Sequence, residues 1–299
     1  MPALMGDQNL AQLPKFSLKG WTDGSFQKAY DQNLENRIGF RPSLVRLKNQ
    51  VEYTLFKKAN ASGVVVGKKG YLFEEDYIRA YTGGDYLGEW FWSQKFHRFA
   101  MVRDTLNSLG IKLALVLEPG KASYYPEYIP ENKLKDGIGD TNYKAILKHS
   151  TTQSIPLLDL NKLFIDRKEA SDFPYFPKGG IHWAYSAMLE AADTLLRFAD
   201  ELTDMEIPDM QIHQGLITDS VKYTDNDLLD LMNLIVSPSH PKMHYPKITF
   251  EELSDSLKPR VLTISDSFFF NILNAGIPKK AFANEAFWYY SRAIYPETW

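Results

Sequence analysis

A serine follows the most strand-like segment near the C-terminus. Residues 260–264 (Arg-Val-Leu-Thr-Ile) predict a strand, and Ser265-Asp266-Ser267-Phe268 comes directly after it. In an open parallel sheet, ligands bind outside the carboxyl ends of the strands. A serine at a strand-to-helix turn exposes its hydroxyl, and the helix that follows offers N–H groups to a developing oxyanion. Ser267 is therefore a candidate nucleophile, and the alternative is that it only caps the helix.

A serine hydroxyl attacks poorly unless a base removes its proton, so a histidine is needed at the same edge of the sheet. His182 has the most suitable position, because it follows a glycine-bearing loop and precedes an amphipathic helix. The alternative for His182 is a structural role, in which it packs beside Trp183. His240 and His244 flank Pro241 and cannot form a helical metal pair, so no metal site is expected. The histidines with more structural settings are His97, His149 and His213.

The elements that must hold the serine and the histidine alternate between helix and strand. Apolar residues at steps of three and four predict helices over residues 90–109 and 183–202, and another helix is expected near 141–152. Short apolar runs predict strands over 111–117, 155–160 and 260–264. This alternation predicts the α/β class, with a doubly wound, mostly parallel sheet of flavodoxin-like topology and helices on both faces.

The first 60 residues read differently from the rest. A polar, loop-like lead from Pro2 to Gly24 precedes a helix expected from Pro42 to Lys58. Residues 63–73 then carry the pattern of a β-hairpin. We therefore expect an N-terminal extension with a helix over residues 1–60 and an α/β domain over 61–299.

Composition narrows the classes of function. The 299 residues are 44% hydrophobic and 24% charged, with a net charge of −3 and no cysteine. This is globular composition, and the interleaved charges favour neither nucleic acid nor an anionic membrane surface as partner. Without cysteine, disulfides, thiolate metal sites and cysteine nucleophiles are excluded. No apolar run reaches about 18 residues, and the N-terminus lacks a secretory signal, so either the protein is cytosolic or an export segment has been removed.

Several short blocks, taken in order, resemble the SGNH hydrolase-like domain of the alginate O-acetyltransferase family, the AlgX and AlgJ type. The likeness covers roughly residues 35–270, and the order of the blocks carries it. The blocks are Asn36-Arg37-Ile38-Gly39-Phe40-Arg41, Val66 to Phe73, Leu117-Glu118-Pro119-Gly120-Lys121, Tyr125 to Pro130, Leu158-Asp159-Leu160, His182-Trp183 and Ser265-Asp266-Ser267-Phe268.

The resemblance implies an SGNH hydrolase-like fold and ester chemistry in which Ser267 attacks an acetyl ester and His182 is its base. It also implies a carbohydrate polymer and an acyl donor as partners, with a membrane-bound acyl-transfer protein as one candidate donor. No cofactor is expected. A periplasmic or cell-envelope location is implied, with membrane contact only through an N-terminal anchor that this chain lacks.

Two positions depart from the family pattern. The family usually places an aspartate two residues before the histidine, where this chain has Gly180, and Ser265 replaces the usual glycine before Asp266. Loss of the orienting carboxylate costs about four orders of magnitude in a serine triad. Acids at predicted strand ends, or shortly before the histidine, are candidates to replace it, although each could instead be a cap or loop carboxylate. They are Glu118, Asp159 and Asp172.

Other residues are candidate contacts for the substrate or the oxyanion: Asp266, Lys121, Tyr124 and Trp183. Lys121 would bind a substrate anion or the acyl oxygen, and the alternative is a solvated loop lysine. Residues 225–230 resemble a calcium loop but lack its glycine and distal glutamate, so we expect the start of a helix there. Aromatic residues that could stack on sugars, or simply belong to the core, are Tyr124, Tyr125, Trp183, Trp288, Tyr289 and Tyr290.

The sequence leaves the reaction partly open. A transferase and an esterase differ only in whether a sugar hydroxyl or water resolves the acyl-serine, so the two are not separated. The rival from another class is a non-catalytic polysaccharide-binding or assembly protein with a degenerate site, which Gly180 favours. A cytosolic esterase is the third alternative.

Overall fold

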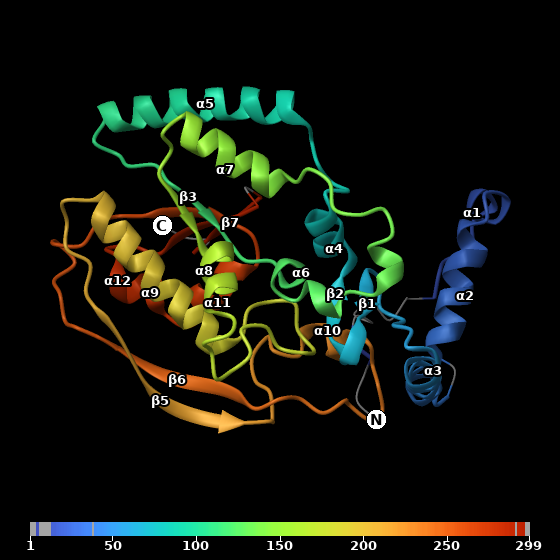
Figure 1. Ribbon diagram of the computed structural model, residues 1–299. Coiled ribbons are helices and arrows are strands. Elements are labelled where there is room, and N and C mark those ends of the chain that lie inside the picture. Colours follow the sequence, from blue (N-terminus) through green and yellow to red (C-terminus); the bar gives the residue numbers. More distant parts are fainter. Residues whose placement is uncertain (1–3, 6–12, 38, 291, 297–299) are drawn as a thin grey trace.

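The computed structural model describes residues 4–5, 13–37, 39–290 and 292–296. Helices lie on both sides of short strands (Figure 1). Helices α5 (Glu89–Ser108) and α7 (Asn142–Thr152) lie on one side of strands β3 (Leu115–Leu117) and β7 (Leu262–Ser265), and α9 (Tyr185–Leu202) lies on the other. The predicted α/β class is therefore confirmed.

The strands form short, separate sheets. Strand β3 pairs in parallel with β4 (Leu157–Asp159), and β7 pairs in parallel with β8 (Ala286–Tyr289), to which β9 (Ala293–Tyr295) is antiparallel. The described strands do not form the continuous doubly wound sheet that we expected. Each parallel strand has only three or four residues, and the ends of β3 and β7 meet through side chains instead, because Ser265 Oγ donates to Glu118 Oε1 at 3.3 Å.

The main hydrophobic core is organised around α9. Half of its six buried residues are alanines, Ala187, Ala191 and Ala192, none of which is exposed. Small side chains allow close approach, and α11 (Phe268–Asn274) and β6 (Met243–Phe250) both pack on this helix. Strand β6 pairs antiparallel with β5 (Met210–Thr218), and this long hairpin lies beyond α9 in Figure 1.

The remaining elements connect these layers. The predicted hairpin is present as β1 (Val64–Val66) and β2 (Leu72–Glu74), which pair antiparallel. The others are α1 (Leu18–Thr22), α2 (Ser25–Arg37), α3 (Arg41–Phe56), α4 (Glu75–Thr82), α6 (Lys121–Tyr124), α8 (Leu160–Arg167), α10 (Asp227–Leu231), α12 (Ile277–Ala281) and the 3₁₀ turns η1 (Lys68–Gly70), η2 (Pro126–Tyr128) and η3 (Glu131–Lys133).

Some predicted elements differ from the structure. Helix α5 has the predicted bounds to within one residue. Two of the apolar residues whose spacing predicted a buried face, Val102 and Leu109, are 51% and 68% exposed. The predicted loop-like lead contains α1, while Pro2 and the block residue Ile38 lie outside the described residues. The β5–β6 hairpin was not predicted, because most side chains of β5 are exposed and a long connection containing α10 separates the two strands.

Helix α3 confirms the helix predicted from Pro42 to Lys58, and it packs against α10. Asn49 Nδ2 donates to the carbonyl oxygen of Met232 at 2.8 Å, in a buried position. Tyr53 packs on a small apolar cluster that includes Leu228 and Leu229 of α10. Helix α3 is thus one of the elements that support α10.

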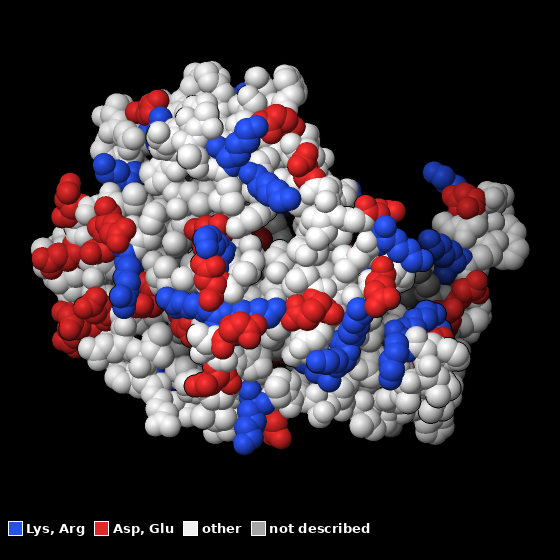
Figure 2. Space-filling view, viewed as in Figure 1, with Lys and Arg blue, Asp and Glu red and all other residues white. Residues whose placement is uncertain are grey.

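Neither sign of charge dominates the face of the molecule seen in Figure 2. On the face shown in Figure 2, basic and acidic side chains are interleaved, in keeping with the net charge of −3. In the part of the chain that the structure describes, no helix combines the length and the apolar character that crossing a membrane requires.

The Asn49 contact predicts a measurable stability effect. Asn49→Ala leaves the buried Met232 carbonyl without this donor, so the free energy of unfolding should fall by about 1–3 kcal/mol. Urea denaturation measures this change, with the exposed Lys48→Ala on the same helix as the control. Equal stability of the two variants would contradict the bracing role of α3.

Candidate active site

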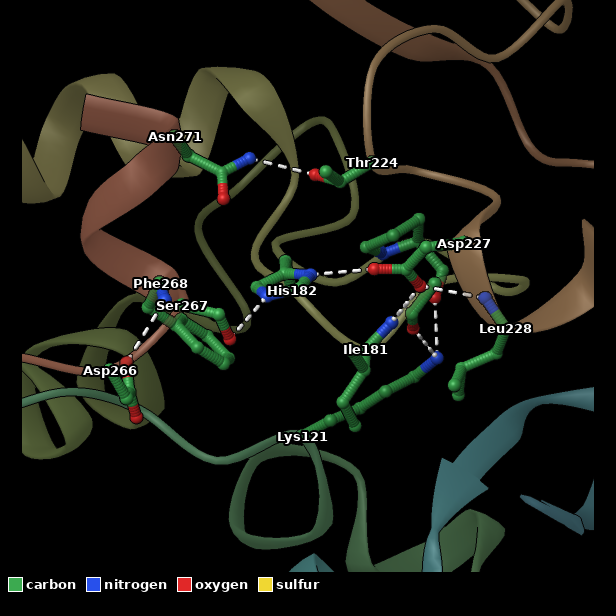
Figure 3. A network of polar contacts seen from close by, with 12 residues as sticks. Lys121, Ile181, His182, Thr224, Asp227, Leu228, Asp266, Ser267, Phe268 and Asn271 are labelled. Atoms are coloured by element: carbon green, nitrogen blue, oxygen red, sulfur yellow. Dashed lines mark hydrogen bonds and ion pairs between the residues drawn. The ribbon is translucent and has the colours of Figure 1, made fainter. Parts of the chain in front are cut away.

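Ser267 occupies the turn between β7 and α11, as the sequence predicts. It stands at the N-cap position of α11, but its side chain makes no capping hydrogen bond. Asp266 Oδ1 instead accepts the backbone N–H of Phe268 at 2.9 Å. The Ser267 hydroxyl therefore points away from the helix, and its Oγ lies 2.9 Å from Nε2 of His182 (Figure 3).

His182 lies between a hydroxyl and a carboxylate. Its Nδ1 is 2.6 Å from Asp227 Oδ2, and its Nε2 faces Ser267. The ring packs against Phe268, with 4.8 Å between ring centroids, and the side chain is 14% exposed. A carboxylate at Nδ1 favours the tautomer that carries its proton there, which leaves Nε2 free to accept the proton of the serine.

The carboxylate that faces His182 belongs to Asp227, which is not among the acids predicted from the sequence. Its Oδ1 accepts the backbone N–H groups of Ile181 at 2.9 Å and of Leu228 at 2.7 Å, while Oδ2 faces the His182 ring. It is also the first residue of α10, where the helix dipole favours a negative charge. The expected helix start within residues 225–230 is confirmed, but nothing in that acidic run indicated which histidine it would meet.

Gly180 explains why the acid comes from a different segment. A Cβ at this position would lie 2.6 Å from the Thr224 carbonyl oxygen and 3.0 Å from the Asp225 carbonyl carbon. The loop that leads to Asp227 thus packs directly on Gly180. An aspartate two residues before the histidine, as in the family pattern, does not fit here.

A buried tyrosine anchors the same loop. Tyr245 of β6 donates its hydroxyl to Asp225 Oδ2 at 2.7 Å and accepts the backbone N–H of Lys222 at 2.8 Å. Burial raises the pKa of Asp225 to about 7. The loop that leads to Asp227 is therefore anchored to β6, and Asp227 itself begins α10.

Lys121 has a structural role that corrects its predicted contact with substrate or oxyanion. Its ammonium is completely buried and donates to three backbone carbonyls, those of Pro177 at 2.6 Å, Lys178 at 3.2 Å and Gly180 at 2.7 Å. Three N–H donors thus meet three acceptors in the loop that precedes His182. Burial lowers the pKa of Lys121 to about 7, opposed by the nearby charges of Asp227 and Asp225.

The three acids predicted to orient His182 lie elsewhere, since its two ring nitrogens face Asp227 and Ser267. Asp159 caps α8, accepting the Lys162 N–H at 2.9 Å, and also accepts the Tyr143 hydroxyl at 2.7 Å. Asp172 is exposed. Glu118 accepts a hydrogen bond from the Ser265 hydroxyl. Burial, together with the charge of Asp266, raises the pKa of Glu118 well above its usual range.

The aromatic candidates separate by burial. Tyr124 and Trp183, predicted as substrate contacts, are 3% and 1% exposed and belong to the core, so that prediction is wrong. Tyr125 is also buried, and Trp288 and Tyr289 are partly buried. Tyr290 is 54% exposed, and its backbone N–H donates to the Ser265 carbonyl at 2.9 Å. Of the six residues, Tyr290 has the exposure that a sugar-stacking platform needs.

A cavity of about 190 Å³ lies next to the Asp266–Phe268 turn. Glu118, Asp266 and Phe268 are among its lining residues, and so are Tyr77, Tyr81 and Tyr143. A larger hollow of about 1060 Å³, between β6 with its following loop and α12, contains no residue of the Ser267–His182–Asp227 series. The smaller cavity is lined by Asp266 and Phe268, the two neighbours of Ser267 in the sequence, but not by Ser267, His182 or Asp227 themselves.

A serine, an imidazole and a carboxylate bonded in series at the end of a strand have the geometry of a serine hydrolase triad. Residues 64–254 match the family model described as "SGNH hydrolase-like domain, acetyltransferase AlgX". Because this match covers more than half of the chain, the chain belongs to that family, and the predicted resemblance and SGNH hydrolase-like fold are confirmed.

Two Pseudomonas proteins are similar in sequence, and both are named "Probable alginate O-acetylase AlgJ". The chain is 27% identical over 182 residues to the P. aeruginosa protein, which covers 59% of this chain and 44% of that protein. For the P. syringae pv. tomato protein the identity is 27% over 136 residues, or 44% and 33% of the two chains. This chain thus spans less than half the length of either relative.

A solved structure supports the fold. The "O-Acetyltransferase Domain of Pseudomonas putida AlgJ" aligns with a TM-score of 0.50 and 20% identity, over 76% of this chain and 79% of that one. At this identity the likeness concerns the fold alone.

The position of Asp227 predicts a loss of turnover on substitution. In Asp227→Asn the amide cannot stabilise a protonated imidazole, so kcat for ester hydrolysis should fall about a hundredfold to ten-thousandfold. The matched control is Asp230→Asn on the exposed side of α10. If both variants kept activity within twofold of the parent, Asp227 would not be the orienting acid.

The Lys121 contacts predict a stability loss. Lys121→Met removes the donor shared by three carbonyls and should lower the free energy of unfolding by about 2–5 kcal/mol. Chemical denaturation compares it with Lys144→Met, which changes a lysine of α7 outside the buried core. Similar unfolding midpoints for both variants would show that Lys121 is not a brace.

Proposed function

We propose that this chain transfers acetyl groups to a hydroxyl of a carbohydrate polymer through an acetyl-serine intermediate on Ser267. The observation that carries the proposal is the series Asp227–His182–Ser267, with 2.6 Å and 2.9 Å between the bonded atoms. The names of the two similar Pseudomonas proteins support the acetyl group and the carbohydrate as the chemical classes involved.

In the first half-reaction the Ser267 oxygen attacks the carbonyl carbon of an acetyl ester, and His182 Nε2 takes the hydroxyl proton. The C–O bond to the donor alcohol then breaks, and the same imidazole returns the proton to the departing oxygen. Asp227 stabilises the imidazolium that exists between these steps. The oxyanion of the tetrahedral intermediate needs N–H donors. The backbone N–H of Phe268 already donates a hydrogen bond to Asp266 Oδ1.

In the second half-reaction the hydroxyl of an acceptor attacks the acetyl-serine. His182 removes the acceptor proton, a new ester bond forms on the acceptor, and the proton returns to Ser267 as its ester bond breaks. A sugar hydroxyl as acceptor gives transfer, and water gives hydrolysis. Transfer is the proposal here because both similar proteins are named as O-acetylases.

The setting of the reaction is part of the proposal. Acetylation of a cell-envelope or exported polysaccharide places this domain in the periplasm or cell envelope. The acyl groups would then come from a membrane-bound acyl-transfer partner. Shared family membership supports both expectations.

The rival proposal is a non-catalytic polysaccharide-binding protein that kept the fold. Gly180 was the sequence feature that favoured it, because the acid expected near that position is missing. The Asp227 carboxylate lies where such an acid would act. This contact supports the enzyme over a degenerate site.

Replacement of the nucleophile tests the proposal. Ser267→Ala removes the attacking oxygen, so hydrolysis of p-nitrophenyl acetate should fall at least about a thousandfold. The release of nitrophenol measures this, with Ser265→Ala as the neighbouring serine control. The proposal fails if Ser267→Ala hydrolyses the ester as fast as the parent protein.

A further inference from the structure

The loop that leads to Asp227 is tied to the helix that follows Ser267. Asn271 of α11 donates from Nδ2 to Thr224 Oγ1 at 2.7 Å, in a partly buried position (Figure 3). Asn271 comes four residues after Ser267, which is about one turn further along the helix. The helix that presents the nucleophile therefore also binds the segment that presents the acid.

Thr224 and Asp227 belong to one hydrogen-bonded turn. The backbone N–H of Asp227 donates to the Thr224 carbonyl oxygen at 3.2 Å. The same carbonyl oxygen lies against Gly180, where a Cβ would come within 2.6 Å of it. Because only two residues separate Thr224 from Asp227, a contact that fixes the Thr224 side chain also limits where the Asp227 carboxylate can lie.

These contacts close a ring around the groups of the triad. Asp227 Oδ2 is 2.6 Å from His182 Nδ1, and His182 Nε2 is 2.9 Å from Ser267 Oγ. The bond between Asn271 and Thr224 completes the ring from the serine helix back to the acid. A fully bonded polar network rigidifies its members, because none of them can move without breaking a contact elsewhere.

The conformation of the acid loop requires anchors of this kind. Tyr223, directly before Thr224, has a φ of 54°, in the left-handed region that residues with a side chain seldom adopt. Such a backbone conformation persists only where surrounding contacts hold it. Hydrogen bonds hold the residues on both sides, since the Lys222 N–H donates to the Tyr245 hydroxyl and the Thr224 hydroxyl accepts from Asn271.

We propose that Asn271 and Thr224 are a positioning pair, which keeps the Asp227 carboxylate at Nδ1 of His182. The inference rests on the proposed acetyl-serine chemistry and adds to it the two residues that align its acid. The pair acts through Asp227 and does not touch the reacting atoms. When the bond is removed, the loop relaxes and the imidazolium loses part of the stabilisation that the carboxylate provides.

Two matched substitutions of one residue test the pair. Thr224→Val keeps the branched shape but removes the hydroxyl that accepts the hydrogen bond, whereas Thr224→Ser keeps the hydroxyl. We expect Thr224→Val to lower kcat/KM for p-nitrophenyl acetate about tenfold to a hundredfold, and Thr224→Ser to stay within about threefold of the parent. Asn271→Leu, which removes the donor, should repeat the effect of Thr224→Val.

The Asp227→Asn background separates positioning from a general loss of structure. No carboxylate remains there to be positioned, so Asn271→Leu should lower kcat/KM by less than about twofold in that background. A contact that only stabilises the fold would give the same factor in both backgrounds. Every rate is measured on protein that circular dichroism shows to be folded.

The outcomes distinguish this inference from the proposed function. Equal rates for Thr224→Val and Thr224→Ser, or the same loss on Asn271→Leu with and without the Asp227 carboxylate, overturn the positioning pair while the acetyl-serine chemistry stands. Release of nitrophenol that does not depend on Ser267 overturns the proposed function itself.

Discussion

The Asp227 carboxylate accepts three hydrogen bonds at once, from the His182 ring and from the backbone N–H groups of Ile181 and Leu228. A partly buried carboxylate is costly unless it is hydrogen-bonded, so these bonds fix the relative position of the histidine loop and α10. Other buried contacts reinforce both partners. Lys121 donates to the backbone of the histidine loop. Tyr245 binds the segment before Asp227, and α3 binds the end of the helix that follows it.

Local setting was enough to single out Ser267 and His182 as a candidate pair. A serine after a strand and a histidine before a helix each have a position that restricts what they do, and the structure brings Ser267 and His182 together. The acid depends on packing between distant segments. Gly180 leaves room for the Thr224 carbonyl, and this close approach brings the segment that contains Asp227 to the histidine loop. A close backbone contact of this kind leaves no periodic signal in the sequence.

The same limit applies to Lys121 and to helix α5. The sequence around Lys121, a loop with helix-breaking residues, predicts a solvent-exposed lysine. The side chain is instead completely buried, and hydrogen bonds to three backbone carbonyls stabilise its ammonium there. Helix α5 was predicted from its period, but which of its apolar residues are covered depends on neighbours that the pattern does not specify. The division of the chain near residue 60 stays a prediction, and the Asn49–Met232 bond links the two parts.

An acyl group that resides on Ser267 during turnover is the step on which the proposed chemistry depends. Rapid quenching of the reaction with p-nitrophenyl acetate, followed by peptide mapping by mass spectrometry, tests it most directly. We expect one acetyl group on the peptide that contains Ser267, appearing with the first turnover and disappearing when an acceptor is added. An acetyl group on another residue, or steady turnover with no modified Ser267 peptide, would contradict it.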